Sequence, residues 1–311
     1  MGIRVRFAES TDDLDALFRL RHRVYVDEKG WFPAARDGRV IDRFDAYPNK
    51  VNVIAVVEGQ VVGGVRFVES SPVGMPADHF FDFSPFLPSG ARVGSASLLC
   101  LDPELRKSGG LVSSMFGMGY HWALGRGLTH LVGPFNPAVA PAFLATGVRP
   151  VAPEFIHEES GLPVVPAIFT LAELDERYLE FARRQGIEHF LQSLERQFHH
   201  QGEVIVRQGE YGDAAFVVVD GEVSVTVGSG GSAHEVARLE RGELFGEIAL
   251  LIPRPRSATV VALTDVDLMV LERPVFLKEL ETNPIVGIRL LETLGTRLAD
   301  LDERLGKLES G

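Results

Sequence analysis

The stretch FGEIALLIPRPRSATV, residues 245–260, places one acidic and two basic side chains inside an otherwise apolar run. Gly246 permits a close approach of the backbone, and the residues after it predict one helical turn whose free N–H groups face an anion. Two prolines fix the return of the chain, so that the planar guanidinium of Arg256 points back at that turn. Glu247 can then accept a hydrogen bond from a sugar hydroxyl. The stretch therefore predicts a site for a ligand with one phosphate and one ribose.

The sequence around this stretch consists of short β-branched segments separated by glycines. They run from Gly202 to Arg273, and examples are GEVIVRQGEYGDAAFVVVDGEVSVTV and SATVVALTDVDLMVLE. Regular short strands with glycine turns indicate a β-barrel or jelly roll. The segment 274–311 that follows has helical periodicity.

Residues 202–273 resemble a cyclic nucleotide-binding domain, and residues 245–260 resemble its phosphate-binding cassette. The resemblance implies that Arg256 binds the cyclic phosphate and that Glu247 binds the ribose 2′-hydroxyl. It also implies that nearby backbone N–H groups complete the cradle. The expected cyclic-nucleotide-binding residues are Gly246, Glu247, Ile248, Ala249, Arg256, Ser257 and Ala258. Ser257 leaves both cAMP and cGMP open as effectors, and we favour cAMP. The alternative is a barrel that has lost its ligand.

The helices expected over 274–311 would close over the base and report whether nucleotide is bound. Bacterial relatives often append a helix-turn-helix DNA reader, but this segment has no glycine turn followed by a basic helix. The net charge of −12 also argues against broad contact with a phosphate backbone. We therefore expect no nucleic-acid partner. The leucine-bearing end of the segment could pair with a second copy as a homodimer, or pack on its own barrel.

The first half of the chain alternates segments of strand and helix character, which indicates a mixed α/β domain over 1–172. Ser10 or Thr11 is expected to cap the first helix, and Glu58-Gly59 to form a hairpin turn. A charged helical connector is expected over 173–201. Together with the barrel over 202–273, the fold class is α+β. The elements expected in the first half are a strand at 3–10, a helix from 11, a hairpin over 51–70, a strand at 91–102, a helix at 109–127, a strand at 128–135, a short helix at 138–148 and a strand at 162–171.

The order of these elements resembles the GNAT acyltransferase fold, and LDPELRKSGGL resembles its turn between a strand and a helix. In that family the free N–H groups of the helix receive the pyrophosphate of coenzyme A. The expected residues on the acyl-donor side are Leu99, Cys100, Leu101, Arg106, Lys107, Ser108, Gly109 and Gly110. Leu111 stands where a small residue is usual, so either acyl-CoA or an acyl-carrier protein could be the donor. Phe143 and Leu144 stand where that family often has a tyrosine acid.

A second resemblance, to the acyl-homoserine-lactone synthases and the N-acyl amino acid synthases, covers RHRVYVDEKGW, IDRFDAYPN and VVGGVRF. It implies that the acceptor side is formed by Arg21, Tyr25, Trp31, Asp42, Asp45 and Arg66. The lactone synthases carry charged residues on their central strand, whereas GSASLL is uncharged here, which argues against lactone synthesis. The alternatives are packing of the two aromatic residues and solvation of the two loop carboxylates.

The chemistry implied is the attack of an amine on a thioester carbonyl. It requires a splayed strand whose backbone N–H polarises the carbonyl, which we expect around Leu98–Leu101, and a base for the ammonium. Asp45 and Glu69 are the candidate bases. Histidines show no metal-ligand spacing, and His199-His200 suggest a solvated turn, so no metal is expected. Cys100 is expected to be a buried strand residue.

The chain has one cysteine and lacks both a run of about 18 apolar residues and an apolar leader at its start. These features predict a cytoplasmic protein without a membrane span. Two hypotheses of different class result. The first is an N-acyltransferase enzyme regulated by a cyclic nucleotide. The second is a non-catalytic sensor or adaptor with a degenerate acyltransferase fold.

Overall fold

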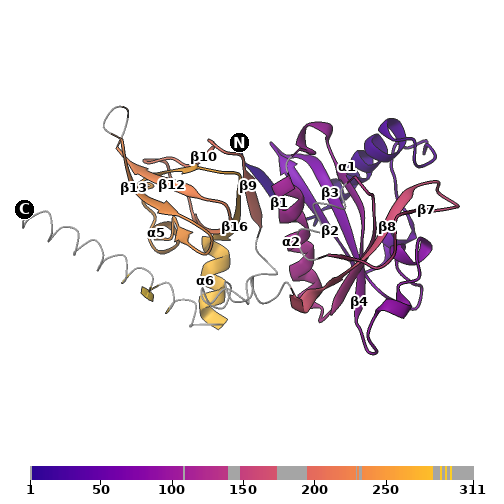
Figure 1. The fold of residues 1–311 in the computed structure, drawn as a ribbon. Helices are drawn as coiled ribbons and strands as arrows, with labels where there is room; N and C mark the ends of the chain where they lie inside the picture. Colours follow the sequence, from indigo (N-terminus) through magenta and orange to yellow (C-terminus); the bar gives the residue numbers. More distant parts are fainter. Residues whose placement is uncertain are drawn as a thin grey trace, which may run out of the picture. The chain divides into compact units, whose positions relative to one another are not determined.

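The computed structural model describes residues 2–107, 109–138, 148–173, 195–228, 230, 233–282, 288, 291–292 and 295. The chain divides into two compact units, whose elements are labelled in Figure 1. The first unit comprises Met1–Arg177 and Glu195–His200, and the second comprises Tyr178–Leu194 and Gln201–Gly311.

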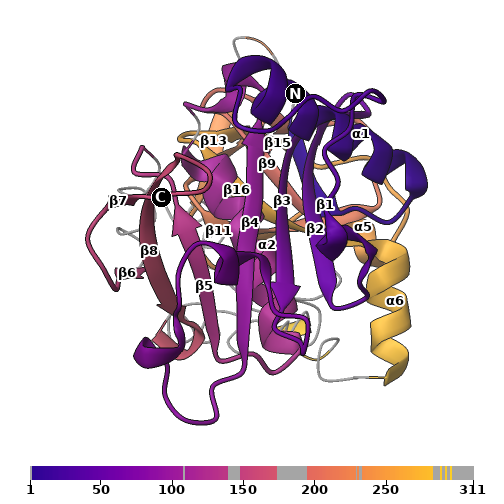
Figure 2. The ribbon, with the colours of Figure 1, turned by 90° about the vertical axis from the view of Figure 1, so that its right-hand side faces the viewer.

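A mixed sheet forms the centre of the first unit (Figure 2), with the strand order β9-β1-β2-β3-β4-β5-β8-β6. Neighbouring strands are antiparallel except for β4 and β5, which are parallel, and β7 pairs with β8. The strands are β1 Ile3–Phe7, β2 Lys50–Val57, β3 Gln60–Glu69, β4 Val93–Leu101, β5 His130–Phe135, β6 Arg149–Pro150, β7 Phe155–Ile156, β8 Pro163–Thr170 and β9 Arg196–His199.

Two helices of this unit begin where the sequence predicts them. Helix α1, Thr11–His22, starts with a capping box in which the Ser10 hydroxyl accepts from the N–H of Asp13 and the Asp13 carboxylate accepts from the N–H of Ser10. It continues as a π-helical segment, η1, Arg23–Glu28. Helix α2, Gly109–Gly125, follows β4. The short 3₁₀ helices are η2 Arg43–Ala46, η3 Pro76–His79, η4 Ser84–Phe86 and η5 Pro103–Leu105.

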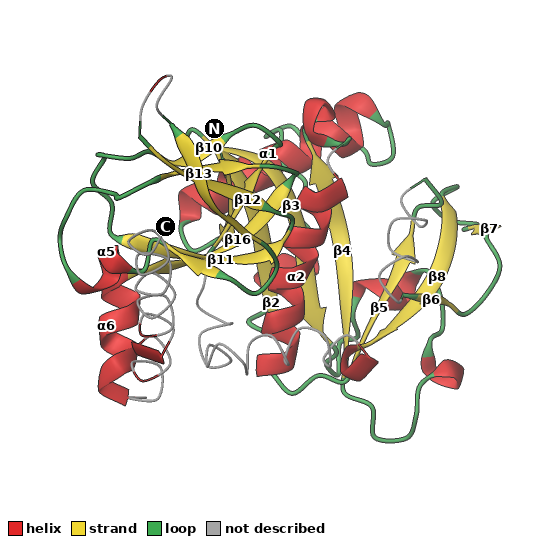
Figure 3. Cartoon of the chain, turned by 60° about the vertical axis from the view of Figure 1, so that its left-hand side comes forward, coloured by secondary structure: helices red, strands yellow, loops and turns green. Residues whose placement is uncertain are grey.

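The helices α1 and α2 cover opposite faces of the sheet (Figure 3). Side chains alternate along a strand, so neighbours in β2 serve different cores. Ile54 packs with Leu17 and Leu20 of α1, whereas Val53 packs with Leu111 and Met115 of α2. Each of these six side chains is essentially inaccessible to solvent, and its burial contributes about 1.5–3 kcal/mol. The near-continuous apolar sequence of β2 follows from burial on both faces.

The second unit is a two-sheet structure, as expected for a jelly roll. One sheet contains β14-β11-β16 and the other contains β10-β15-β12-β13. Their inner faces share a core that includes Phe216, Val218, Val260 and Leu268. The elements are β10 Val204–Val206, β11 Ala214–Asp220, β12 Val223–Val227, β13 His234–Leu239, β14 Leu244–Phe245, α5 Ile248–Leu251, β15 Thr259–Ala262, β16 Val266–Glu272 and α6 Arg273–Thr282.

Some expectations differ from the structure, and others concern residues outside the described ranges. Arg196–His199 form strand β9 rather than the end of the helical connector expected over 173–201, and His199 is buried, so its expected place in a solvated turn is wrong. Strands β6 and β7, of two residues each, were not predicted from the sequence. The expected short helix at 138–148 with Phe143 and Leu144, the connector from 174 to 194, Ser108 and most of 283–311 lie outside the described residues.

Candidate functional site

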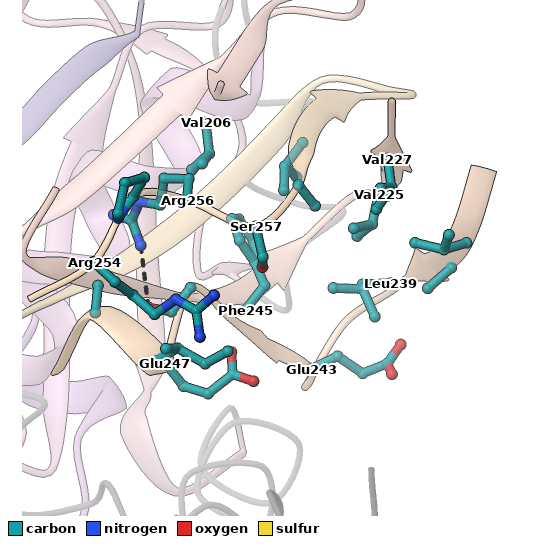
Figure 4. Close-up of a pocket in the computed structure, with 18 of the residues that line it drawn as sticks. Val206, Val225, Val227, Leu239, Glu243, Phe245, Glu247, Arg254, Arg256 and Ser257 are labelled. Carbon is teal, nitrogen blue, oxygen red and sulfur yellow. Dashed lines mark hydrogen bonds between the residues drawn. The ribbon is translucent and has the colours of Figure 1, made fainter. Parts of the chain in front are cut away.

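A cavity of about 580 Å³ opens in the second unit at the stretch 245–260 (Figure 4). One wall is apolar, and the opposite wall is the cassette itself. The apolar wall includes Val206, Val225, Val227, Leu239 and Val260, and the cassette wall includes Gly246, Glu247, Ile248, Ala249, Arg254, Arg256, Ser257 and Ala258. All seven residues predicted to bind the nucleotide line this one cavity. Arg254 lines the cavity as well and was not predicted. Its position two residues before Arg256, in Arg254-Pro255-Arg256, could have indicated that it lies at the same site.

Arg256 is half-buried at the cassette and donates to backbone oxygens. Its Nη1 donates to the Gly246 carbonyl at 3.1 Å, and its Nη2 donates to the Ala214 carbonyl at 2.7 Å. Burial lowers the pKa of Arg256, against the opposing charges of Asp213 and Glu247. Within the described residues its guanidinium forms no salt bridge. The cation is therefore held by dipoles and is available to an anion.

The position of the Arg256 guanidinium requires glycine at two neighbouring positions, 212 and 246. A Cβ atom on Gly246, whose φ is +75°, would lie 2.7 Å from Nη1, and one on Gly212 would lie 2.8 Å from Nη2. Any larger residue at either position would displace the guanidinium. The two glycines therefore set the place of the positive charge.

Glu247 and the helical turn α5 form the other side of the cassette. Glu247 is buried and caps α5, since its carbonyl accepts from the N–H of Leu250 at 3.0 Å. The N–H of Ala249 donates to the Gly246 carbonyl at 3.1 Å. Ile248 and Ser257 border the cavity beside them. A carboxylate and a guanidinium thus face one cavity, which suits a ligand with both a hydroxyl and a phosphate.

The first unit contains a network of four charged side chains on the α1 face of the sheet. Arg21 on α1 donates from Nη1 to both oxygens of Asp45, at 3.0 Å each. Arg66 on β3 binds both oxygens of Asp42, at 2.6 and 2.7 Å, and its Nη1 lies 3.0 Å from Asp45 Oδ2. Asp42 caps η2, and its N–H donates to Asp45, which fixes both carboxylates. The structure thus brings together four of the six residues predicted on the acceptor side.

Burial differs sharply between the two carboxylates. The Asp45 side chain is 1% exposed and that of Asp42 is 42% exposed. Burial acts to raise the pKa of Asp42, but the hydrogen bond and charge of Arg66 outweigh it and lower this pKa. Asp45, enclosed by two guanidinium groups, is a structural counter-ion, and this geometry does not suit the base role expected for it.

Two polar residues of this network were missed by sequence reasoning. Asn52 on β2 accepts from Arg21 Nη2 at 2.8 Å through its side-chain oxygen, and Ser97 on β4 accepts from Arg66 Nε at 3.2 Å. Both stand on strands among apolar residues. Asn52 is buried, and a polar residue buried in the apolar strand β2 is a signal that could have identified it, because such a group needs a partner. Ser97 is only partly buried and gives no such signal.

Strand β4 carries a bulge at the expected site of carbonyl polarisation. Gly64 pairs with Cys100 and Arg66 pairs with Ser97, so Leu98 and Leu99 together oppose one residue of β3. Leu98 has a φ of +53°, in the left-handed region that a non-glycine residue rarely adopts. The pairing of β4 with β5 ends at Ser95, before the bulge. Beyond that point the two parallel strands separate.

The two aromatic residues predicted on the acceptor side pack against this bulge. Tyr25 in η1 is 8% exposed, and its hydroxyl donates to the Leu99 carbonyl at 2.5 Å. Trp31 lies 5.9 Å from the Tyr25 ring, centroid to centroid. Tyr25 and Leu98 belong to the same apolar cluster. Tyr25 is therefore a direct contact of β4 at the bulge.

The residues predicted to bind the acyl donor lie at the end of β4 and the start of α2, and Arg106 is already engaged there. It pairs with both oxygens of Glu28 at 2.5 Å and donates to the Leu101 carbonyl at 3.0 and 3.1 Å. Arg106 holds the pKa of Glu28 at about 2. Lys107 is exposed, and Gly109 and Gly110 open α2 as predicted. Leu111, the departure from the family pattern, is a core residue.

Glu69, the second candidate base, lies at the end of β3 on the α2 face. Phe67, two residues earlier, packs in the α2-side core, and Arg66 points to the other face. Burial acts to raise the pKa of Glu69, but hydrogen bonds from Arg126 at 2.7 Å and Arg92 at 3.2 Å lower it. Because the acceptor-side network lies on the opposite face, this position does not suit the base role expected for Glu69.

Cys100 is buried in β4, as predicted, and burial raises the pKa of its thiol to about 12. We expect the native protein to resist alkylation by iodoacetamide at pH 8, because the thiolate is the reactive form. The unfolded protein should incorporate one label per chain, since the sequence has a single cysteine. Mass spectrometry before and after addition of guanidinium measures both. Rapid labelling of the native protein would contradict the buried position.

The described residues contain neither a candidate metal-ligand cluster nor a helix that could span a membrane. No group of three or more His, Cys, Asp or Glu side chains among them is arranged to hold a metal ion. None of the helices within the described ranges is both long and apolar enough to cross a membrane.

Two protein-family models match the chain. Residues 16–169 match the model of the N-acyl amino acid synthase FeeM, and residues 196–283 match the model of the cyclic nucleotide-binding domain. The second match begins at β9, which belongs to the sheet of the first unit.

Individual proteins resemble one part of the chain or the other. The cyclic AMP receptor protein of Thermus thermophilus is 36% identical over 119 residues, 38% of this chain and 55% of that protein. The cGMP-dependent protein kinase of Plasmodium berghei is 46% identical over 61 residues, 20% of this chain and 7% of the kinase. The solved structure of FeeM, an N-acyl amino acid synthase from uncultured soil microbes, has a TM-score of 0.48 at 16% identity, covering 57% of this chain and 94% of its own. The chain thus spans about half, or less, of the curated relatives it matches.

Proposed function

Because the chain joins a domain of the N-acyl amino acid synthase family to a cyclic nucleotide-binding domain, we propose that it is an N-acyltransferase regulated by a cyclic nucleotide. The acyl group passes from a thioester, either acyl-CoA or an acyl-carrier protein, to the amine of an amino acid. The single observation that carries the proposal is the bulged β4 that separates from β5 beside the network of Arg21, Asp42, Asp45 and Arg66.

The reaction breaks one bond and forms one. The amine nitrogen attacks the carbonyl carbon of the thioester, a C–N bond forms, and the C–S bond breaks. The products are an amide, a free thiol and the proton released by the ammonium group. Backbone N–H groups of β4 stabilise the negative charge that develops on the carbonyl oxygen. Asp42, the exposed carboxylate of the network, is suited to orient the ammonium group before it loses its proton.

The effector site is the cavity at 245–260. Arg256 neutralises the cyclic phosphate, Glu247 accepts from the ribose 2′-hydroxyl, and the valines of β10 and β12 contact the purine. The similarity to a cAMP receptor protein favours cAMP, while the similarity to a cGMP-dependent kinase makes cGMP the necessary comparison. Regulation requires the nucleotide to bind one state of the protein better than another. Since both cyclic nucleotides and acyl thioesters are cytoplasmic compounds, we place the protein in the cytoplasm.

A non-catalytic sensor remains the second candidate function, and one observation favours it. Arg106 and Glu28 bind each other at the start of α2, and Leu111 replaces a small residue there. A donor must reach this turn past that ion pair. A degenerate fold that binds an acyl ligand without transferring it would have the same features.

Release of thiol separates the two candidates. The full chain is incubated with octanoyl-CoA, palmitoyl-CoA or the same acyl groups on an acyl-carrier protein, each with a mixture of amino acids. We expect thiol release that depends on the amino acid and changes on addition of cAMP. The single buried cysteine contributes little to a thiol assay of the native protein. Absence of release with every donor, with and without either nucleotide, contradicts the enzyme and supports the sensor.

A further inference from the structure

The edge of β4 beyond Ser95 has no strand partner on the β5 side among the described residues. The hydrogen bonds between β4 and its other neighbour, β3, show which residues of β4 face the open edge. The N–H of Asp102 donates to Val62 O of β3, so Asp102 and Cys100 face β3, because peptide groups alternate along a strand. The carbonyl groups of Leu99 and Leu101 and the N–H of Leu101 therefore point to the open side. An open edge normally offers carbonyl acceptors and N–H donors together.

Two carbonyl oxygens on this open edge, those of Leu99 and Leu101, accept hydrogen bonds from side chains of the chain itself. The Tyr25 hydroxyl donates to Leu99 O at 2.5 Å, and Arg106 donates to Leu101 O from Nε at 3.1 Å and from Nη2 at 3.0 Å. The N–H of Leu101 points outward on the same edge, because it alternates with the groups of Cys100 that face β3. From this we infer that Tyr25 and Arg106 are positioning residues, which leave the open edge of β4 as a donor rather than an acceptor for the carbonyl oxygens of the acyl donor.

A single segment controls both occupied carbonyls. Tyr25 belongs to η1, and Arg106 is held by both oxygens of Glu28, the last residue of η1. The pKa of Tyr25 is raised by burial, so its phenol stays protonated and remains a donor at neutral pH. A π-helical segment has an extra residue in its turn, which changes the direction of the side chains it presents. Here it directs Tyr25 at the bulge and leaves Glu28 beside Arg106.

The hydrogen bond to Leu99 O affects how well β4 can stabilise the negative charge that develops during acyl transfer. A thioester carbonyl gains negative charge as the amine attacks, and a nearby free carbonyl oxygen would oppose that charge. Occupying Leu99 O removes this opposition and fixes the peptide plane beside the bulge. The inference rests on the proposed function, because it assigns a purpose to the edge only if a thioester is bound there.

Tyr25→Phe removes only the hydroxyl that binds Leu99 O. We expect kcat for octanoyl-CoA to fall about tenfold or more, since one misaligned oxyanion donor has an effect of that order, while the KM of the amino acid stays within about twofold. Tyr211→Phe, at a position that is 77% exposed in the second unit, is the matched control and should equal the wild type. An inactive wild type contradicts the proposed function, whereas an active wild type with an equally active Tyr25→Phe variant contradicts only this inference.

Glu28→Gln tests the role of Arg106. The KM of octanoyl-CoA should change in opposite directions if Arg106 positions Leu101 O and if it binds the donor phosphates. If Arg106 serves to hold Leu101 O, loss of its ion pair should raise the KM of octanoyl-CoA several-fold. If Arg106 instead binds the phosphates of the donor, release from Glu28 should lower that KM. Glu28 is exposed, so this variant should fold even if Tyr25→Phe does not. A KM that is lowered or unchanged overturns the positioning role of Arg106.

Discussion

Replacing Arg256 with alanine should lower the affinity for cAMP at least about a hundredfold. The guanidinium is the cationic group that two glycines and two carbonyl oxygens place at the cassette. Its loss leaves a partly buried phosphate without its charge-assisted hydrogen bonds, and a hundredfold change corresponds to about 2.7 kcal/mol. Titration calorimetry of the full chain with cAMP, and separately with cGMP, measures the effect.

Two further variants make this prediction specific. Arg254→Ala changes a neighbouring arginine of the same cavity that is exposed and outside these carbonyl contacts, so it should weaken binding much less. Arg256→Lys keeps the charge but lacks the planar fork, and its affinity should fall between those of the wild type and Arg256→Ala. Equal loss in Arg254→Ala and Arg256→Ala would mean that general positive charge, rather than the placed guanidinium, binds the phosphate.

The sequence could predict the elements whose signals are local. Ser10 and Asp13 form the capping box within one turn of chain, and Glu58-Gly59 adopt the positive φ angles of a hairpin turn. The cassette was predictable for the same reason, because its glycine, carboxylate and guanidinium lie within eleven residues of each other.

Features that depend on distant partners could not be predicted. Strand β9 is paired by β1, where Phe198 lies opposite Ile3, and no local pattern in the short segment 196–199 specifies this pairing. Arg106 stands before a glycine turn, which suggests a phosphate contact, but its direction is set by Glu28, 78 residues earlier. Asp45 likewise looks like a loop carboxylate until two arginines from α1 and β3 enclose it.

The enclosure of Asp45 leads to the largest stability change that we expect in the first unit. Asp45→Ala leaves the buried guanidinium groups of Arg21 and Arg66 with one carboxylate, Asp42, between them. Removing one partner of a buried ion pair costs about 3–5 kcal/mol, because a charge remains without compensation. Asp42→Ala is the matched control, since Asp42 binds the same Arg66 but its side chain is 42% exposed. Solvent can replace that carboxylate in part, so a smaller loss is expected.

Unfolding of the full chain in urea, followed with and without cAMP, measures this difference. Cyclic AMP stabilises the unit that binds it, so the transition that cAMP shifts belongs to the second unit and the other belongs to the first. Asp45→Ala should lower the midpoint of the first-unit transition more than Asp42→Ala does. Adding Arg21→Met to Asp45→Ala should restore part of the loss, because it removes one of the uncompensated charges. If the double variant is less stable than Asp45→Ala alone, the buried charge is not what Asp45 compensates, and hydrogen bonding by Arg21 to Asn52 is the larger contribution.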